Sequence, residues 1–449
     1  MDIFVIINLI TLRRIFMNKK SLPKFFWPVL VVLSLVGQIA WVIENMYFNV
    51  FIYKMFNASA DDIALMVTAS AVAATLTTIV IGALSDKIGK RKLFISGGYI
   101  LWGISIICFA FIRIDIIDSL FPSIVSAASV GVSLTIILDC VMTFFGSSAN
   151  DACFNAWLTE TVPDSQRGAA EGINAMMPLL AIIAVFGGFM GFDLDKAESW
   201  TSIYLIIGFA VLIIGILTIF FLKESTTINE NNSSFLGNIF YGFRPNVIKH
   251  NVSLYITLIA FAVFGISIQV FMPYLILYYN VSLGLDNYVL IMAPAIILAA
   301  VATAFYGRVY DKVGYIKSLV PTIIALCVGY VVLYLFKNTA LVFVGSLLMM
   351  CGYLCGSAVF GAMIREKIPA NKAGMFQGLR IVGQVLVPGI IGPVIGAKVL
   401  ENALTVIGDD GTESFIPNEN IFLAALIVAV LLFVIIFIQN FLLKKEKNV

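Results

Sequence analysis

Charge is scarce in this chain of 449 residues, because Asp, Glu, Lys and Arg make up only 12% of it. A soluble globular protein carries about 25%. Histidine occurs once, at position 250, and the six cysteines lie in apolar stretches without other metal ligands. The sequence contains no phosphate-binding loop, nucleophile elbow or His/Asp cluster. These absences exclude a soluble protein and argue against an enzyme, a metal site or a bound cofactor.

Hydrophobic residues make up 61% of the chain and occur in long blocks. Crossing a bilayer takes roughly 20 residues per helix, and in lipid such blocks are helical because the backbone must satisfy its own hydrogen bonds. The sequence therefore predicts an all-α membrane protein with twelve transmembrane helices in two six-helix bundles. The predicted spans lie near 25–51, 62–84, 93–112, 133–158, 168–192, 201–222, 252–281, 287–307, 316–336, 339–364, 374–400 and 421–443.

Basic residues predict the orientation, because Lys and Arg accumulate in cytoplasmic loops. With cytoplasmic termini, five of the 28 basic residues lie outside and one, Arg380, lies in a span, which leaves 22 inside. The five outer residues are Lys54, Arg113, Lys196, Lys337 and Lys398. We expect an integral protein of the plasma (inner) membrane, with both termini cytoplasmic. We also expect it to be monomeric in the lipid bilayer, with no nucleic-acid partner. Met17 is an alternative to Met1 as the true start.

The longest polar stretch, "KESTTINENNSSFLGNIFYGFRPNVIKH", falls in the middle of the chain. It is typical of a cytoplasmic linker between two halves. The predicted organisation is then a cytoplasmic N-terminal segment, a first bundle, a linker, a second bundle and a cytoplasmic tail, at residues 1–24, 25–222, 223–250, 251–443 and 444–449.

The two halves carry the same sequence patterns. "GALSDKIGKRK" (82–92) matches "GRVYDKVGYIK" (307–317) at an offset of 225, and "TETVPDSQRGAAEG" (159–172) matches "REKIPANKAGMFQG" (365–378) at an offset of 206. The smaller second offset places an insertion in the first half, for which residues 113–132 are the candidate. Two halves in parallel repeat are the architecture of alternating-access transporters.

"GALSDKIGKRK" resembles the signature G-x-L-x-D-[RK]-x-G-[RK]-[RK] of the major facilitator superfamily, in the loop between its second and third helices. By this resemblance, charges at the loop close the cytoplasmic side, and Glu160 is the expected partner of Arg91. Gly82 and Gly89 suit close helix approach and a tight turn. Arg380 is either a gate residue or a substrate ligand. For Lys90 and Lys92, positive-inside anchoring is the simpler explanation. The expected gate residues are Gly82, Asp86, Gly89, Arg91, Glu160, Asp311, Gly314, Glu366 and Arg380.

Polar residues inside the spans indicate a binding site, because buried ionisable groups in membranes face the bundle interior or a water-filled cavity. Trp41, Glu44 and Asn45 share one face of the first helix, and an aromatic ring beside acceptors and donors suits a sugar. The 225 offset maps Glu44 onto Gln269. The alternative is that Glu44 pairs with a neighbouring helix and never meets substrate. The expected substrate-binding residues are Trp41, Glu44, Asn45, Asn49, Asp151, Asn155, Gln269 and Tyr274.

A second polar row follows the fourth span at four-residue steps: Asp139, Thr143, Ser147, Asp151, Asn155 and Thr159. Asp151, in the inner half, is the better candidate for an ion or proton site. Asp139 is equally well a residue of the outer vestibule. We expect Glu44 and Asp151 to be the ion-coupling carboxylates.

"WLTETVPDSQRG" (157–168) resembles the end of the fourth helix in the glycoside–pentoside–hexuronide:cation symporters, a sugar-carrying branch of that superfamily. The resemblance implies uptake of a sugar or glycoside with a proton or a sodium ion. A proton is favoured, because the second span has no carboxylate beyond Asp61 and Asp62. A proton-coupled exporter is the alternative, although the fifth span lacks the exporter pattern G-P-x-x-G-G. A non-transporting sugar sensor is a third possibility.

Overall fold

The computed structural model of the protein describes residues 22–121, 126–224, 241–285, 287–368, 377–407 and 413–447. Within them, twelve helical spans are long and apolar enough to cross a membrane. Each span overlaps one of the twelve predicted from the sequence, so the all-α fold and the number of spans are confirmed. The chain is an integral membrane protein.

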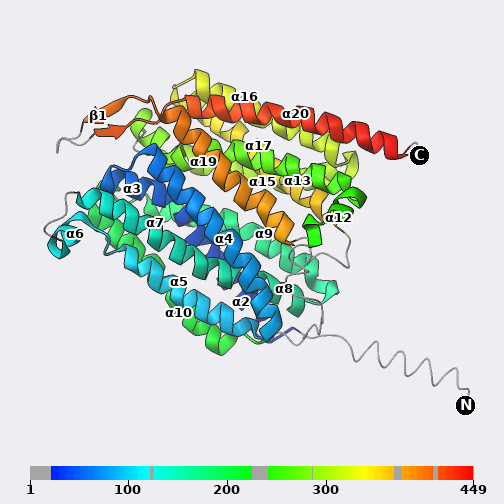
Figure 1. Cartoon of the computed structure of the whole chain (residues 1–449), viewed down its shortest axis with the longest axis horizontal. Helices are drawn as coiled ribbons and strands as arrows, with labels where there is room; N and C mark the ends of the chain where they lie inside the picture. The colour runs from blue at the N-terminus through cyan, green and yellow to red at the C-terminus, as the bar shows by residue number, and fades with distance from the viewer. Residues whose placement is uncertain are drawn as a thin grey trace, which may run out of the picture.

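The first six spans form one bundle (Figure 1). Its first span is built from three consecutive segments, and so is its fourth. The helices are α2 (Phe26–Val42), η1 (Ile43–Tyr47), α3 (Phe48–Phe56), α4 (Ala60–Ile88), α5 (Arg91–Phe109), α6 (Ile114–Leu120), α7 (Ala127–Gly146), η2 (Ser147–Phe154), α8 (Asn155–Thr161), α9 (Asp164–Phe189) and α10 (Ala197–Phe221).

The last six spans form the second bundle. Two short helices at the end of the linker precede it along the chain. The helices are η3 (Tyr241–Phe243), α12 (Pro245–His250), α13 (Val252–Phe271), η4 (Met272–Tyr274), α14 (Leu275–Leu277), η5 (Tyr278–Ser282), α15 (Val289–Val313), α16 (Tyr315–Leu335), α17 (Thr339–Lys367), α18 (Gln377–Ile381), η7 (Val382–Leu386), α19 (Val387–Leu400) and α20 (Asn420–Lys447). Between α19 and α20, β1 (Thr405–Ile407) and β2 (Glu413–Phe415) form an antiparallel hairpin.

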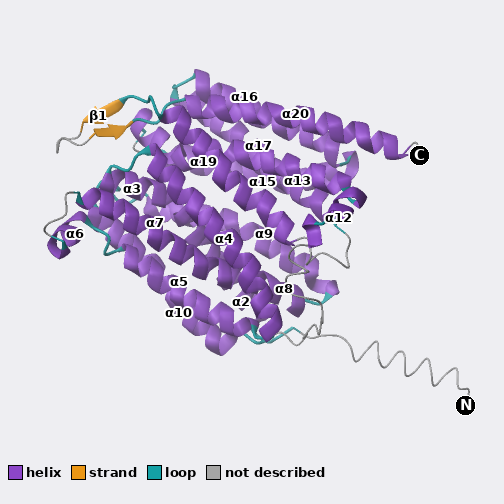
Figure 2. Cartoon of the chain, viewed as in Figure 1, coloured by secondary structure: helices purple, strands orange, loops and turns teal. Residues whose placement is uncertain are grey.

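Two helix pairs join the bundles, since α4 packs along α19 and α9 packs along α15. A β-carbon at Gly389 of α19 would lie 2.4 Å from that of Ala71 in α4, so these helices touch closely. In Figure 1 the β-hairpin and α6 lie at one end of the molecule, and α8 and α12 lie at the other. We call these the hairpin end and the linker end. Figure 2 shows strands only at the hairpin end.

Several spans are interrupted by π-helical turns at their polar residues. Segments η1, η2, η5 and η7 are π-helices, and η4 is a turn of 3₁₀-helix that includes Pro273. π-turns in helices occur frequently at functional sites. Segments η1 and η4 contact each other across the two bundles. The 225 offset relates these two breaks, so the seventh span is broken at nearly the same place as the first.

The repeated loops adopt the turns that their glycines predict. Helix α4 ends at Gly89 with φ 69°, and α15 ends at Gly314 with φ 90°. Residues other than glycine rarely adopt positive φ. The other end of α4 is fixed by a capping box, in which Ser59 and Asp62 exchange hydrogen bonds.

Several features outside the spans differ from the sequence-based expectations or go beyond them. The insertion near 113–132 contains the short helix α6, and the fourth span begins at Ala127 rather than near 133. The segment after the eleventh span forms the β-hairpin, which apolar periodicity did not indicate. The predicted linker, 223–250, ends in helical turns, while its residues 225–240 lie outside the described residues, so its domain boundaries stay a prediction.

Candidate functional site

Glu44 lies on η1 inside the first bundle, with 8% of its surface exposed. Its Oε1 accepts hydrogen bonds from Ser70 Oγ of α4 at 2.5 Å and from Thr143 Oγ1 of α7 at 2.9 Å. Its Oε2 is buried and has no hydrogen-bond partner in the described part of the chain. Three spans therefore meet at this carboxylate, which faces helices rather than lipid.

Asp151 lies on η2, two helical turns beyond Thr143 toward the linker end. Ser147 Oγ donates to its Oδ2 at 3.0 Å, and Asn150 Nδ2 donates to its Oδ1 at 3.4 Å. Its side chain is half-buried. The polar row predicted along the fourth span is thus a row of hydrogen-bonded groups that starts beside Glu44.

Asp139 differs from its expected place at the outer vestibule. It is 1% exposed, and its Oδ1 is buried without a hydrogen-bond partner in the described residues. It lies on α7, one helical turn from Thr143, whose hydroxyl donates to Glu44. The fourth span buries this side chain in the first bundle, where α7 packs against α4 and α5.

The remaining predicted ligands on the first and fourth spans differ in accessibility. Asn45 and Asn155 are exposed, and Trp41 is half-buried. The Trp41 ring packs on Trp102 of α5, with ring centroids 5.0 Å apart. Asn49 is fully buried, and its Nδ2 donates to the Asn45 carbonyl at 3.1 Å. Of these four, Asn49 is out of reach of a ligand in this conformation.

The two predicted ligands in the seventh span lie at different depths. Gln269 is half-buried and packs against α19, where a β-carbon at Gly392 would lie 2.4 Å from the Gln269 β-carbon. Tyr274 is fully buried, and its hydroxyl donates to the Ala60 carbonyl of the first bundle at 3.0 Å. Tyr274 therefore joins the two bundles here instead of lining an open site.

Arg91 links three helices of the first bundle at the linker end. Its Nη2 pairs with Glu160 Oε1 of α8 at 2.6 Å and also with Asp86 of α4, and its Nη1 donates to Ser85. The expected pair with Glu160 is confirmed. The side chain of Arg91 is 8% exposed, so this network is largely desolvated on the arginine side.

The other gate residues are less closely connected. At Gly82 a β-carbon would meet only Ala152, at 3.8 Å, so the close helix approach expected there is absent. Arg380 Nε donates to Gln384 Oε1 at 2.9 Å. Glu366 is exposed at the end of α17, and the side chain of Asp311 lies outside the described residues.

Hydrogen bonds between the bundles gather at the hairpin end, and we call this group the hairpin seal. Besides Tyr274 and Ala60, it contains three pairs of residues. They are Tyr53 Oη to the Phe415 carbonyl at 2.6 Å, Ser414 Oγ to Asn57 Oδ1 at 2.7 Å, and Tyr288 Oη to Tyr47 Oη at 3.3 Å. The β-hairpin thus covers the end of the first span.

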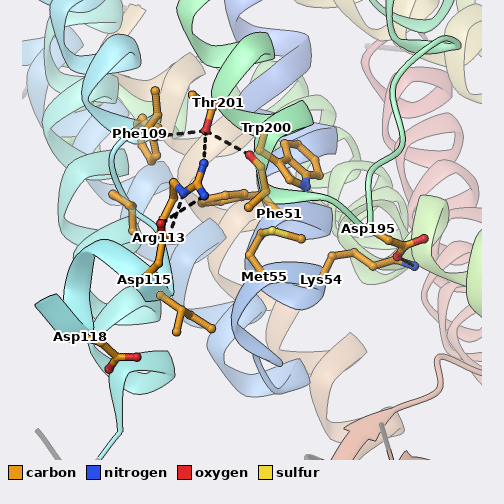
Figure 3. A pocket seen from close by; sticks show the side chains of 14 residues that line it. Phe51, Lys54, Met55, Phe109, Arg113, Asp115, Asp118, Asp195, Trp200 and Thr201 are labelled. Atoms are coloured by element: carbon orange, nitrogen blue, oxygen red, sulfur yellow. Dashed lines mark hydrogen bonds and ion pairs between the residues drawn. The ribbon is translucent and has the colours of Figure 1, made fainter. Parts of the chain in front are cut away.

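A cavity of about 530 Å³ lies at the hairpin end of the first bundle (Figure 3). Arg113, Asp115 and Trp200 are among its lining residues, and none of the predicted substrate ligands is. Hydrogen bonds from Arg113 hold the pKa of Asp115 below its usual value. Lys54 pairs with Asp195 at 2.7 Å on the opposite wall. This cavity lies apart from the polar row around Glu44.

Sequence reasoning missed Ser70, which holds Glu44, and gave Asp139 the wrong surroundings. Ser70 is one of several small polar residues in the second span, and only the packing of α4 on η1 distinguishes it. For Asp139 a signal existed, because it begins the same four-residue row as Thr143 and Asp151.

The sequence model of the Major Facilitator Superfamily matches residues 27–393 of the chain. A search of curated protein sequences returned no match. Among solved structures, a point mutant of the nucleoside transporter NupG superposes with a TM-score of 0.69 at 13% identity, over 92% of this chain and 98% of that one. The E. coli xylose transporter XylE, in a partially occluded inward-open conformation, gives 0.66 at 13% identity, over 91% and 98%.

A bacterial homolog of the human lysosomal transporter Spinster, inward-facing and unoccupied, gives a TM-score of 0.64 at 16% identity, over 92% of this chain and 96% of that one. Such low identities establish the fold alone. The family match covers most of the chain, from the first span into the eleventh, and agrees with the twelve spans. The chain therefore belongs to the Major Facilitator Superfamily and is a membrane transporter of small molecules rather than an enzyme.

Proposed function

We propose that the protein takes up a sugar or glycoside by alternating access and couples this uptake to a cation, with a proton favoured over sodium. The observation that carries the proposal is the position of Glu44. A carboxylate is costly inside a membrane and persists there where it has a function or a partner. Glu44 has two hydroxyl donors and a further oxygen without a partner in the described residues, on a π-turn that contacts the seventh span.

The proposal of a sugar depends on accessible polar side chains of the first, fourth and seventh spans. Asn45, Asn155 and Gln269 offer amides that both donate and accept hydrogen bonds, and they are exposed or half-buried. Trp41 adds an aromatic ring one turn from Glu44. A xylose transporter and a nucleoside transporter are among the structural neighbours, at identities that by themselves carry no argument about substrate.

We propose that the hairpin end faces outward and that the described conformation faces inward. The hairpin seal closes that end. Only five basic residues are expected outside against 22 inside, and this asymmetry favours an outward-facing hairpin end under the positive-inside rule. Each of the five is paired with a carboxylate. The pairs are Lys54–Asp195, Arg113–Asp115, Lys196–Asp193, Lys337–Glu419 and Lys398–Glu401.

The network around Arg91 is proposed to help close the linker end when the hairpin end opens. It fixes the ends of α4, α5 and α8 as one unit, and that unit moves toward the second bundle. Protonation and substrate then favour the same closed state, so each raises the affinity for the other. Arg380, on the eleventh span, is proposed as a residue of this gate.

The experiment begins with binding of the purified full-length protein to a panel of sugars and glycosides. The best ligand is then tested for uptake into proteoliposomes with an inward proton gradient, an inward sodium gradient, or neither. Accumulation against a concentration gradient only when protons flow inward supports the proposal. Accumulation that needs only sodium makes sodium the coupling ion, and binding of sugar without any accumulation indicates a sensor.

An exporter gives a different result in the same vesicles. In proteoliposomes with an inward proton gradient, an exporter-type antiporter expels preloaded ligand through molecules oriented as in the cell. A symporter accumulates ligand under the same gradient. The direction of ligand flow relative to proton flow therefore separates the two.

A further inference from the structure

Asp139 is a buried carboxylate for which the proposed transport cycle has no role so far. It lies on α7, 1% exposed, in the core of the first bundle. Its Oδ1 is buried and has no hydrogen-bond partner in the described residues. A charged oxygen without a partner is very costly in a medium as apolar as this.

Thr143 of α7 connects Glu44 with the part of the helix that carries Asp139. Thr143 Oγ1 donates to Glu44 Oε1 at 2.9 Å, and Asp139 lies one turn before Thr143 on the same face of α7, a rise of about 6 Å along the helix. Each of the two carboxylates carries a buried oxygen without a partner in the described residues, Oε2 of Glu44 and Oδ1 of Asp139.

Among the described residues, neither Glu44 nor Asp139 forms an ion pair with a cationic side chain. The titratable groups near the pair are Tyr204 of α10, Cys140 of α7 and Asp151 of η2, and none of them is cationic. Arg91 is paired with Asp86 and Glu160 at the linker end. Two neighbouring carboxylates in an apolar core cannot both stay charged unless they bind a cation between them.

The second bundle has no equivalent pair. The repeat offsets of 225 and 206 map Glu44 onto Gln269 and Asp139 onto Gly345, and neither of these residues titrates. Carboxylates at both positions are therefore a property of the first bundle alone.

We infer that Glu44 and Asp139 form one site for a monovalent cation, in which the two carboxylates share a single proton. Asp139 is the half of this site that stays in the bundle core, and Glu44 is the half on the π-turn that contacts the seventh span. Uptake or release of one proton then changes the charge of the turn against η4. The inference deepens the proposed function and rests on it for the role of the proton in transport.

The test is infrared difference spectroscopy of the purified full-length protein, titrated with pH in the absence of any sugar. We compare wild type with Asp139→Asn, Glu44→Gln and Asp118→Asn, a change at an exposed aspartate of α6 that serves as the control. A shared proton predicts a neutral-carboxyl C=O band that both core variants alter and the control leaves unchanged. The titration midpoint in each single variant should move by about one pH unit or more, as expected of coupled sites.

If Asp139→Asn leaves the titration of Glu44 unchanged, the two carboxylates do not share a proton and the inference is overturned. Asp139→Glu is the second variant, in case Asp139→Asn folds poorly. A restored shared titration in Asp139→Glu supports the site, whereas loss of the band in a folded Asp139→Glu protein contradicts it. Sodium that displaces the proton in this assay supports the cation site and makes sodium the coupling ion.

Transport assays keep failure of the inference apart from failure of the proposed function. If Glu44→Gln abolishes uphill uptake and Asp139→Asn has the same pH dependence of uptake as wild type, the proposed function stands and the shared site fails. If wild-type uptake proves independent of protons while the infrared band shows a shared titration, the shared site stands and proton coupling fails. We expect a tenfold or greater loss of uphill accumulation in both variants.

Discussion

The hairpin seal should set the balance between states that are closed and open at the hairpin end. The Tyr274 hydroxyl donates across the bundles to the Ala60 carbonyl at 3.0 Å, in a fully buried setting. Tyr274→Phe removes this hydroxyl and keeps the ring. The change therefore weakens the contact between the bundles. Inside the second bundle it removes only the longer contact of the same hydroxyl to the Pro393 carbonyl, at 3.4 Å.

A hydrogen bond of this kind contributes about 1 kcal/mol, which corresponds to about a fivefold change in the ratio of open to closed molecules. Tyr53→Phe removes the 2.6 Å bond to the Phe415 carbonyl and should act in the same direction. If the effects add, the double variant shifts the ratio about thirtyfold. Both tyrosine rings pack on the Phe415 ring, so a departure from additivity would measure their coupling through the β-hairpin.

The assay is double electron–electron resonance between spin labels at Ser119 and Leu404, two exposed positions at the hairpin end, in a variant without the six native cysteines. The long-distance population should grow in each variant. Tyr330→Phe is the matched control, because it removes a hydroxyl that bonds to Ser267 within the second bundle. Identical distance distributions in wild type and the double variant would refute the assignment of the seal.

Two further predictions concern helix packing and the network at the linker end. A β-carbon at Gly103 would lie 2.5 Å from the backbone nitrogen of Leu212, so Gly103→Ala should destabilise the protein by about 1–3 kcal/mol. The control is Gly97→Ala on the same helix, where a β-carbon would meet no atom within 4 Å, and it should leave the stability unchanged. Thermal unfolding in detergent checks both, and equal melting temperatures would contradict the packing. Arg91→Gln removes the ion pairs of Arg91 with Glu160 and Asp86 and should cost about 3 kcal/mol, whereas Arg91→Lys should retain part of the stability. No loss of stability in Arg91→Gln would mean that the network is not structural.

The sequence was sufficient for the architecture, because apolar length and the internal repeat depend on few physical constraints. Each predicted span overlaps an observed one. Positive φ at Gly89 and Gly314, and the pair between Arg91 and Glu160, were also predictable from the repeated loop.

Depth and packing within the bundle were not predictable in the same way. Asp139, Asp151 and Thr143 share one periodic row, and a period of four residues does not tell which neighbouring helix each one faces. The π-turn η2 adds to this uncertainty, because it rotates the residues that follow it relative to an ideal α-helix. Tyr274 shows the same limit, since its partner is the Ala60 carbonyl of the other bundle.

The β-hairpin and α6 could not be inferred from membrane patterns at all. Both are short elements outside the spans, where hydropathy has no regular period to detect. The β-hairpin is held by contacts from Phe415 and Ser414 to the end of the first span, and these contacts form only in the folded molecule.

The most direct test of the central claim compares two kinds of transport by Glu44→Gln in proteoliposomes. If Glu44 couples sugar movement to a cation, this variant should still exchange sugar between equal concentrations and move it down a concentration gradient. It should fail to accumulate sugar under an inward proton gradient. Asp118→Asn, which removes an exposed carboxylate elsewhere, should both exchange sugar and accumulate it. Normal uphill accumulation by Glu44→Gln would contradict the account.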